Sequence, residues 1–285
     1  MRKPFLRGIQ NVVVKVGTSV LTKNGRFDRR IISELAGEVA VFLKKGVRVS
    51  IVSSGAIGAG MTILGLKERP KTMQGLQAAA AVGQRYLMQC YEEAFSKKGF
   101  STAQMLLTWD DLAHRRRFLN ARHTLEEIQK WNIVPVINEN DTVATDEIRF
   151  GDNDRLSGLL SILIEADVLV ILSDTDGLYS NAGGRPERIQ VVKKMKDSIF
   201  SHVRESKNSF TVGGMRSKLA AVAMCVDAGI PVFLANGRGR NVLGRVFEGE
   251  DIGTFFVPGK SGSRKDWSEH FADHVRRARP HVKNF

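Results

Sequence analysis

Short apolar runs alternate with longer amphipathic stretches along most of the chain. The apolar runs are rich in β-branched residues and predict strands at 12–16, 47–52, 101–107, 133–137, 167–172, 230–235 and 254–257. The amphipathic stretches between them predict helices at 28–44, 55–64, 73–97, 115–130 and 214–228. Because this alternation is typical of βα units, the sequence predicts an α/β fold with a mainly parallel sheet.

The pattern weakens in two regions. Between residues 180 and 211, an Asn/Gly/Pro-rich turn and a polar stretch predict a hairpin and a mobile loop. After Pro258, a Gly/Ser linker leads into a basic tail whose apolar residues recur every four positions, which predicts one short amphipathic helix. We therefore expect one domain over residues 1–258, followed by a basic linker and short tail at 259–285.

Composition and charge narrow the possible classes of protein. The chain of 285 residues is 42% hydrophobic, which is normal for a globular fold, and its formal net charge is +13. Such a charge could attract nucleic acid, an anionic membrane, or small anions such as nucleotides and acidic metabolites. The two cysteines lack CxxC spacing and are expected to be buried free thiols. With no apolar stretch suited to a signal peptide or membrane span, we expect a cytoplasmic protein without membrane association.

A polar segment at residues 138–154 follows the apolar run 133–137. It carries six carboxylates together with three amide side chains, those of Asn138, Asn140 and Asn153. The carboxylates could bind an ammonium group, and the amides could donate hydrogen bonds to carboxylate oxygens. A binding loop for a small, multiply charged substrate is one interpretation, and a solvated loop or a cation site is the other.

Three predicted strands end in glycine-containing polar loops, at residues 15–19, 53–58 and 212–215. Glycines allow backbone N–H groups to approach an anion, and a following helix N-terminus adds favourable partial charge. Lys15 closes an apolar strand and Lys218 lies in the first turn of a predicted helix, so both are suited to neutralise a phosphoryl group during transfer. Ordinary turns with lysines extending to solvent remain the alternative. The sequence contains neither a Walker A motif nor a GxGxxG motif after a strand.

Seven motifs together resemble the glutamate 5-kinases of the amino acid kinase family. In chain order they are VVVKVGTS, IVSSGAIGAG, FLNAR, NIVPVINENDTVAT, GDND, DGLY and GGMRSKLAA, and they cover about residues 9–258. The resemblance implies a three-layer αβα sandwich. It also implies ATP-dependent phosphorylation of the γ-carboxylate of L-glutamate to γ-glutamyl phosphate, the first step of proline biosynthesis.

The resemblance further assigns roles to individual residues. Lys15 and Lys218 would flank the transferred phosphoryl group, and Asp154 would hold both ammonium groups in place. The glutamate site would consist of Ser54, Gly55, Ala56, Asp141 and Asn153. The ATP site would consist of Lys15, Ser173, Asp174, Val212, Gly213, Gly214, Met215, Arg216, Ser217 and Lys218.

The resemblance also implies cofactors and partners. Mg²⁺ is expected on the ATP phosphates, where Asp152 or Asp154 could touch it directly or through water, although no residue is assigned as a direct metal ligand. Proline is expected as a feedback inhibitor, and the chain is expected to form a homo-oligomer, either a dimer or a tetramer. Many members of the family carry a C-terminal PUA domain, and this chain is too short for a complete one.

One motif departs from the family pattern, and two other functions stay open. The loop Thr211–Met215 reads TVGGM where the family usually has GTGGM, so we expect altered nucleotide affinity. Another amino acid kinase specificity, for aspartate or N-acetylglutamate, would use the same scaffold. The three arginines at 115–117 and the basic tail would instead suit a nucleic-acid-binding protein, whose affinity would fall steeply with added salt.

Overall fold

The structure is a computed structural model that describes residues 2–23, 26–144, 153–180, 186–195, 199 and 214–259. The expected tail helix and most of the loop expected between residues 180 and 211 lie outside these ranges. The expected hairpin is present as two short antiparallel strands, β8 (Tyr179–Ser180) and β9 (Glu187–Arg188).

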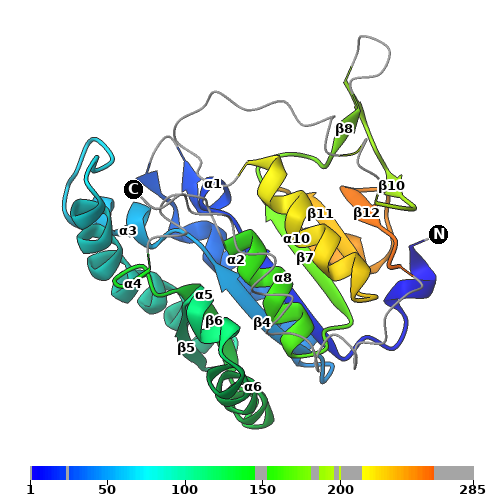
Figure 1. The fold of residues 1–285 in the computed structure, drawn as a ribbon, viewed down its shortest axis with the longest axis horizontal. Helices are drawn as coiled ribbons and strands as arrows, with labels where there is room; N and C mark the ends of the chain where they lie inside the picture. Colours follow the sequence, from blue (N-terminus) through cyan, green and yellow to red (C-terminus); the bar gives the residue numbers. More distant parts are fainter. Residues whose placement is uncertain are drawn as a thin grey trace.

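The described residues form an eight-stranded central sheet with the order β10-β12-β11-β7-β1-β4-β6-β5 (Figure 1). The strands are β1 (Asn11–Val16), β4 (Arg48–Ser53), β5 (Thr102–Leu107), β6 (Val134–Glu139), β7 (Val168–Ser173), β10 (Val191–Val192), β11 (Val232–Asn236) and β12 (Thr254–Phe256). All neighbouring pairs are parallel except β11 and β12. The predicted mainly parallel sheet is therefore confirmed.

Helices cover both faces of this sheet (Figure 1). One face packs against α1 (Thr18–Leu21), α2 (Arg29–Leu43), α3 (Ala56–Ile63), α4 (Met73–Ser96) and α11 (Val242–Phe247). The other face packs against α5 (Trp109–Ala113), α6 (Arg115–Lys130), α8 (Asn153–Leu163) and α10 (Met215–Asp227). Side chains alternate between the two faces of a strand, and in β1 Val12 and Val14 join one core while Val13 joins the other. The fold is a three-layer αβα sandwich, as expected.

Helices α3 and α4 pack at unusually close range because glycines lie at their contact. A Cβ atom on Gly83 would stand 1.9 Å from the carbonyl oxygen of Ala56, and one on Gly60 would stand 1.8 Å from that of Ala79. No side chain fits at these distances, so the two backbones touch directly. The first turn of α3 is consequently fixed against α4.

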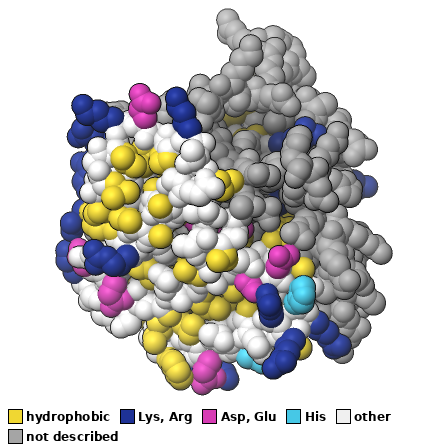
Figure 2. All heavy atoms as spheres, turned by 60° about the vertical axis from the view of Figure 1, so that its left-hand side comes forward, with side chains coloured by type: hydrophobic (Ala, Val, Ile, Leu, Met, Phe, Trp, Pro, Cys, Tyr) yellow, Lys and Arg dark blue, Asp and Glu magenta, His cyan; other side chains and the backbone are white. Residues whose placement is uncertain are grey.

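Apolar side chains are exposed on the outer surface of α3 and the segment after it. Ile63 and Leu64 are each 49% exposed, and Leu66 is 41% exposed; on α4, Val82 is exposed as well. Figure 2 shows hydrophobic side chains gathered on the side of the molecule that includes these helices. Within the part of the chain that the structure describes, no helix combines the length and apolar character needed to cross a membrane.

Candidate active site

Asp154 lies between the two lysines that the sequence analysis singled out. Its Oδ1 is 2.5 Å from Nζ of Lys15, and its Oδ2 is 3.1 Å from Nζ of Lys218. Lys15 comes from the carboxyl end of β1, Asp154 from the first turn of α8, and Lys218 from the first turn of α10. Ser217 also donates a hydrogen bond from its Oγ to Oδ2 of Asp154, over 2.7 Å. The family resemblance assigned Ser217 to the ATP site but did not point to this contact with Asp154.

The side chains of this cluster are buried. Asp154 is fully buried, and Lys15 and Lys218 are 4% and 8% exposed. Burial of the Asp154 carboxyl raises its pKa, but the charges of Lys15 and Lys218 outweigh that effect and hold the pKa below its ordinary value. Asp154 is therefore ionised at neutral pH. One carboxylate between two ammonium groups gives this cluster of three side chains a net positive charge.

Asn153, the neighbour of Asp154 in α8, connects to the adjoining strands. Its Nδ2 donates to Oγ of Ser54 over 3.0 Å and to Oδ1 of Asn138 over 2.8 Å. Ser54 follows β4, and Asn138 lies in β6. Asn153, Ser54 and Asn138 are all buried. The predicted substrate residues Ser54 and Asn153 are thus brought into direct contact.

The loop after β4 turns from the strand directly into α3. Ser54 is tied to the end of β1 by its amide, which donates to the carbonyl oxygen of Val16 over 3.0 Å. Gly55 then adopts φ +106°, a left-handed conformation that favours glycine, and α3 begins at Ala56. The first amides of α3 provide donors with favourable partial charge at the end of the sheet.

Asp141 lies just beyond β6. It is 6% exposed, and the preceding residue Asn140 donates its amide to the carbonyl oxygen of Leu107 at the end of β5. Its sequence position places Asp141 at the same strand-terminal edge as Asn138. The rest of the predicted polar segment, residues 145–152, lies outside the described residues, and so does Asp152.

The described part of the predicted ATP site lies at the ends of β7 and β11 and at the start of α10. Ser173 is buried at the end of β7, where its carbonyl oxygen accepts from the amide of Gly237, while Asp174 is exposed. Gly214 caps α10, and Met215, Arg216, Ser217 and Lys218 form its first turn. Val212 and Gly213 lie outside the described residues.

The residues that the structure describes do not form a protein cage for a metal ion. Among residues 2–23, 26–144, 153–180, 186–195 and 214–259, no group of three or more His, Cys, Asp or Glu side chains is placed to hold a metal. Asp154 already has two ammonium partners, which disfavour direct contact with a cation. Mg²⁺ in kinases is typically held by substrate phosphates, water and one or two carboxylates.

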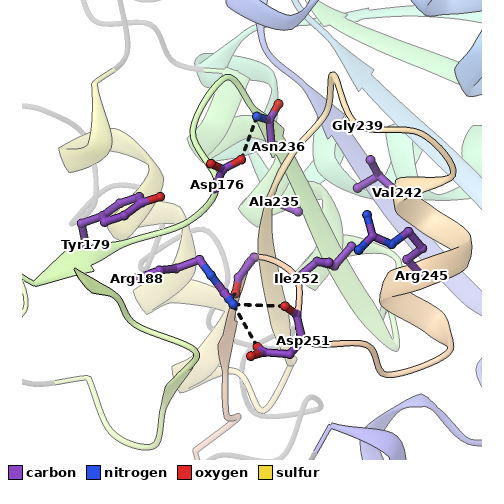
Figure 3. Close-up of a pocket in the computed structure, with 11 residues that line it drawn as sticks. Asp176, Tyr179, Arg188, Ala235, Asn236, Gly239, Val242, Arg245, Asp251 and Ile252 are labelled. Carbon is purple, nitrogen blue, oxygen red and sulfur yellow. Dashed lines mark hydrogen bonds and ion pairs between the residues drawn. The ribbon is translucent and has the colours of Figure 1, made fainter. Parts of the chain in front are cut away.

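A hollow of about 310 Å³ lies beside the ends of β7 and β11 and is bounded by α11 (Figure 3). Its polar groups largely satisfy one another. Asn236 donates to Asp176 over 2.9 Å, and Arg188 pairs with Asp251 over 3.2 Å. None of the predicted site residues lines this hollow.

Comparison with known proteins assigns the family. The sequence pattern of the amino acid kinase family matches residues 10–236. The chain belongs to the amino acid kinase family. Its fold is similar to that of UMP kinase from Bacillus anthracis, with a TM-score of 0.55 and 15% identity over 88% of this chain and 97% of that one.

Within the family, the chain is similar to curated glutamate 5-kinases. It is 46% identical over 262 residues to that of Thermoanaerobacter sp. (strain X514), covering 90% of this chain and 70% of the relative. It is 48% identical over 273 residues to that of Citrifermentans bemidjiense, covering 94% of this chain and 73% of the relative. It is 44% identical over 277 residues to the glutamate 5-kinase of Geobacter metallireducens, covering 95% of this chain and 74% of the relative.

Proposed function

We propose that this chain transfers the γ-phosphoryl group of ATP to the γ-carboxylate of L-glutamate, forming γ-glutamyl phosphate for proline biosynthesis. The observation that carries the proposal is the contact of Asp154 with both Lys15 and Lys218, next to the Asn153–Ser54 pair. The similarity to glutamate 5-kinases at 41–48% identity supports the choice of substrate.

The chemistry requires positioning and charge neutralisation more than proton transfer. A carboxylate acceptor is ionised at neutral pH and needs no general base, and none of the seven site motifs contains a histidine. Lys15 and Lys218 neutralise the equatorial oxygens of the phosphoryl group as it moves between donor and acceptor. Asp154 holds both ammonium groups at that point, so the charges are in place before the substrates bind.

The two substrates approach from opposite sides of the lysine cluster. Ser54, Asn153 and the backbone amides of residues 55–57 bind glutamate, and Asp141 pairs with its ammonium group. ATP lies against Ser173, Asp174 and the first turn of α10. Mg²⁺ would be held mainly by the ATP phosphates and would neutralise part of their charge.

Cellular context and assembly form part of the same proposal. The enzyme works in the cytoplasm, with proline as its feedback inhibitor, in a domain that spans residues 1–258. It forms a homo-oligomer, and the exposed apolar side chains Ile63, Leu64 and Leu66 supply surface for such contacts. Sedimentation would test the oligomeric state.

The test of the function is γ-glutamyl hydroxamate formation from L-glutamate, magnesium-ATP and hydroxylamine. L-Aspartate and N-acetylglutamate serve as parallel acceptors, and reactions lacking ATP or metal serve as blanks. We expect a signal with L-glutamate alone. A signal with only one of the other acids would change the substrate and keep the kinase, whereas no signal with any acceptor would overturn the proposed activity.

A further inference from the structure

Helix α4 contributes two polar side chains to the acceptor side of the site, although no sequence motif points to either. Tyr91 is fully buried, and its hydroxyl donates to Oγ of Ser53 over 2.8 Å. Gln84 accepts a hydrogen bond at Oε1 from Nδ2 of Asn138, over 2.9 Å. These residues are seven positions apart, about two helical turns, so they project from one side of α4.

Each contact continues to a residue of the proposed glutamate site. Ser53 accepts from Tyr91 and donates its own hydroxyl hydrogen to the carbonyl oxygen of Ser54, over 3.0 Å. Asn138 donates to Gln84 and accepts at Oδ1 from Asn153. Since Asn153 also donates to Oγ of Ser54, the two hydrogen-bond chains meet at the Asn153–Ser54 pair.

We propose that Tyr91 and Gln84 are positioning residues of the acceptor site, which orient Ser54 and Asn153 for the glutamate carboxylate without touching the substrate. Tyr91 fixes the strand end that leads into Gly55, and Gln84 fixes the amide of Asn138 so that its Oδ1 faces Asn153. Burying the Tyr91 hydroxyl without a hydrogen-bond partner would be costly. This cost favours the rotamer of Ser53 that places Oγ next to the hydroxyl. This inference rests on the proposed function, since the acceptor is taken to be glutamate.

The close contact between α3 and α4 restricts the position of the loop that Tyr91 and Gln84 would orient. The direct backbone contact at Gly83 and Gly60 leaves no room for α3 to slide along α4. The loop that carries Ser54, Gly55 and Ala56 is therefore held at α3 by packing and at Ser53 by the Tyr91 hydroxyl. Binding residues held this way lose little entropy when a ligand arrives.

The variant Tyr91→Phe removes only the hydroxyl. We expect the KM for glutamate to rise about fivefold to tenfold, which corresponds to the net free energy of roughly one hydrogen bond. The KM for ATP should change by less than about twofold. Tyr86→Phe is the matched control, because Tyr86 lies on the same helix and its ring packs against Phe27 instead of reaching Ser53. We expect it to behave as the wild type.

Variants of Gln84 test the inference independently of Tyr91, and one of them should restore the affinity for glutamate. Gln84→Leu should raise the KM for glutamate, and Gln84→Glu, which keeps an acceptor oxygen for Asn138, should restore most of the affinity. Equal shifts in both KM values, or a lower melting temperature with unchanged KM values, would show a merely structural role and overturn the inference.

Hydrogen exchange separates failure of this inference from failure of the proposed function. The amide of Ser54 donates to Val16, so its exchange reports the order of the strand end. Exchange in the segment 53–57 should be faster in Tyr91→Phe than in Tyr86→Phe. If wild-type protein makes no γ-glutamyl hydroxamate, the proposed function is wrong. The positioning of the segment 53–57 by Tyr91 is then tested only by whether its exchange is faster in Tyr91→Phe than in Tyr86→Phe. If wild-type protein is active while exchange and the glutamate KM are unchanged in Tyr91→Phe, the positioning role is wrong.

Discussion

Asn153 and Asp154 are consecutive residues of α8, yet they serve the two halves of the site separately. Asn153 donates to Ser54 on the acceptor side, and Asp154 accepts from Lys15 and Lys218. Because both lie in one helical turn, a displacement of α8 would move the acceptor contacts and the lysine charges together. Under the proposed function, α8 would fix the distance between the acceptor contacts and the lysines that neutralise the phosphoryl group.

Replacing Lys218 by alanine should lower kcat at least about a hundredfold, because a preorganised charge at the transferred group is lost. Lys218 is 8% exposed and its charge acts in a buried site, so solvent would screen it little. Lys130→Ala is the control, since Lys130 forms an exposed pair with Glu127 over 3.0 Å. Hydroxamate formation at saturating substrates measures the effect. Turnover close to that of the wild type would remove Lys218 from the catalytic group.

The pKa of Asp154 predicts a pH-dependent contribution to stability. Burial raises this pKa, but Lys15 and Lys218 hold it below the ordinary value of 3.8 that the unfolded chain would show. The unfolded state therefore binds the proton first as pH falls. The stabilisation from ionised Asp154 is full above that ordinary value and is lost as pH falls through the lower native pKa.

The variant Asp154→Asn should accordingly lose about 3–5 kcal/mol of unfolding free energy near neutral pH, because two buried ammonium groups lose their counter-charge. The difference from the wild type should shrink as the pH falls below the ordinary value of 3.8. Urea unfolding across this pH range measures it, with the exposed Glu127→Gln as control. A difference that stays constant with pH would contradict the assignment of charge to Asp154.

The sequence missed β10, whose two residues lie in the stretch predicted as a loop, but it predicted the other seven strands of the sheet because the central ones are buried on both faces and form mainly apolar runs. It missed helix α8 for a related reason. In α8, ten of the eleven residues are buried, so no exposed polar face marks the 3.6-residue period. The antiparallel pairing of β11 with β12 was also missed, because strand direction depends on the path of the chain and not on residue pattern.

The candidate site was predictable only in part. Lys15 and Lys218 were recognisable because a charge ends an apolar strand in one case and starts a helix in the other. The Asn153–Ser54 contact joins residues 99 positions apart, which the shared strand-terminal edge of a parallel sheet makes reasonable but does not specify. Tyr91 was hidden entirely, since an aromatic residue on an apolar helix face is the ordinary composition of a core.

Asp141 should determine recognition of the substrate ammonium group. Asp141→Ala should raise the KM for glutamate by at least about tenfold and leave the KM for ATP nearly unchanged, because a buried charge pair is lost on the acceptor side only. Asp141→Asn keeps the shape and removes the charge, so it should match the alanine variant. Initial rates with each substrate varied in turn measure both constants. Equal effects on the two KM values would contradict the assignment of Asp141 to the ammonium group of glutamate.

The backbone contact between α3 and α4 predicts a strong effect from a single methyl group. In Gly83→Ala the new Cβ would stand 1.9 Å from the carbonyl oxygen of Ala56 and 2.2 Å from the amide nitrogen of Gly60, so α3 must move. Overpacking of this kind costs about 1–3 kcal/mol or more. Because Ala56 belongs to the proposed glutamate loop, the KM for glutamate should rise as well.

Gly37→Ala in α2 is the matched control for this change. The nearest atom to its new Cβ would be Cε of Lys98 at 3.9 Å, an ordinary contact. Alanine is favoured over glycine inside a helix by about 0.8–1 kcal/mol, so this variant should be as stable as the wild type or more so. Urea unfolding and glutamate kinetics on both variants provide the comparison. If Gly83→Ala proved as stable and as active as Gly37→Ala, α3 would be free to shift, and the glutamate loop would not depend on its packing against α4.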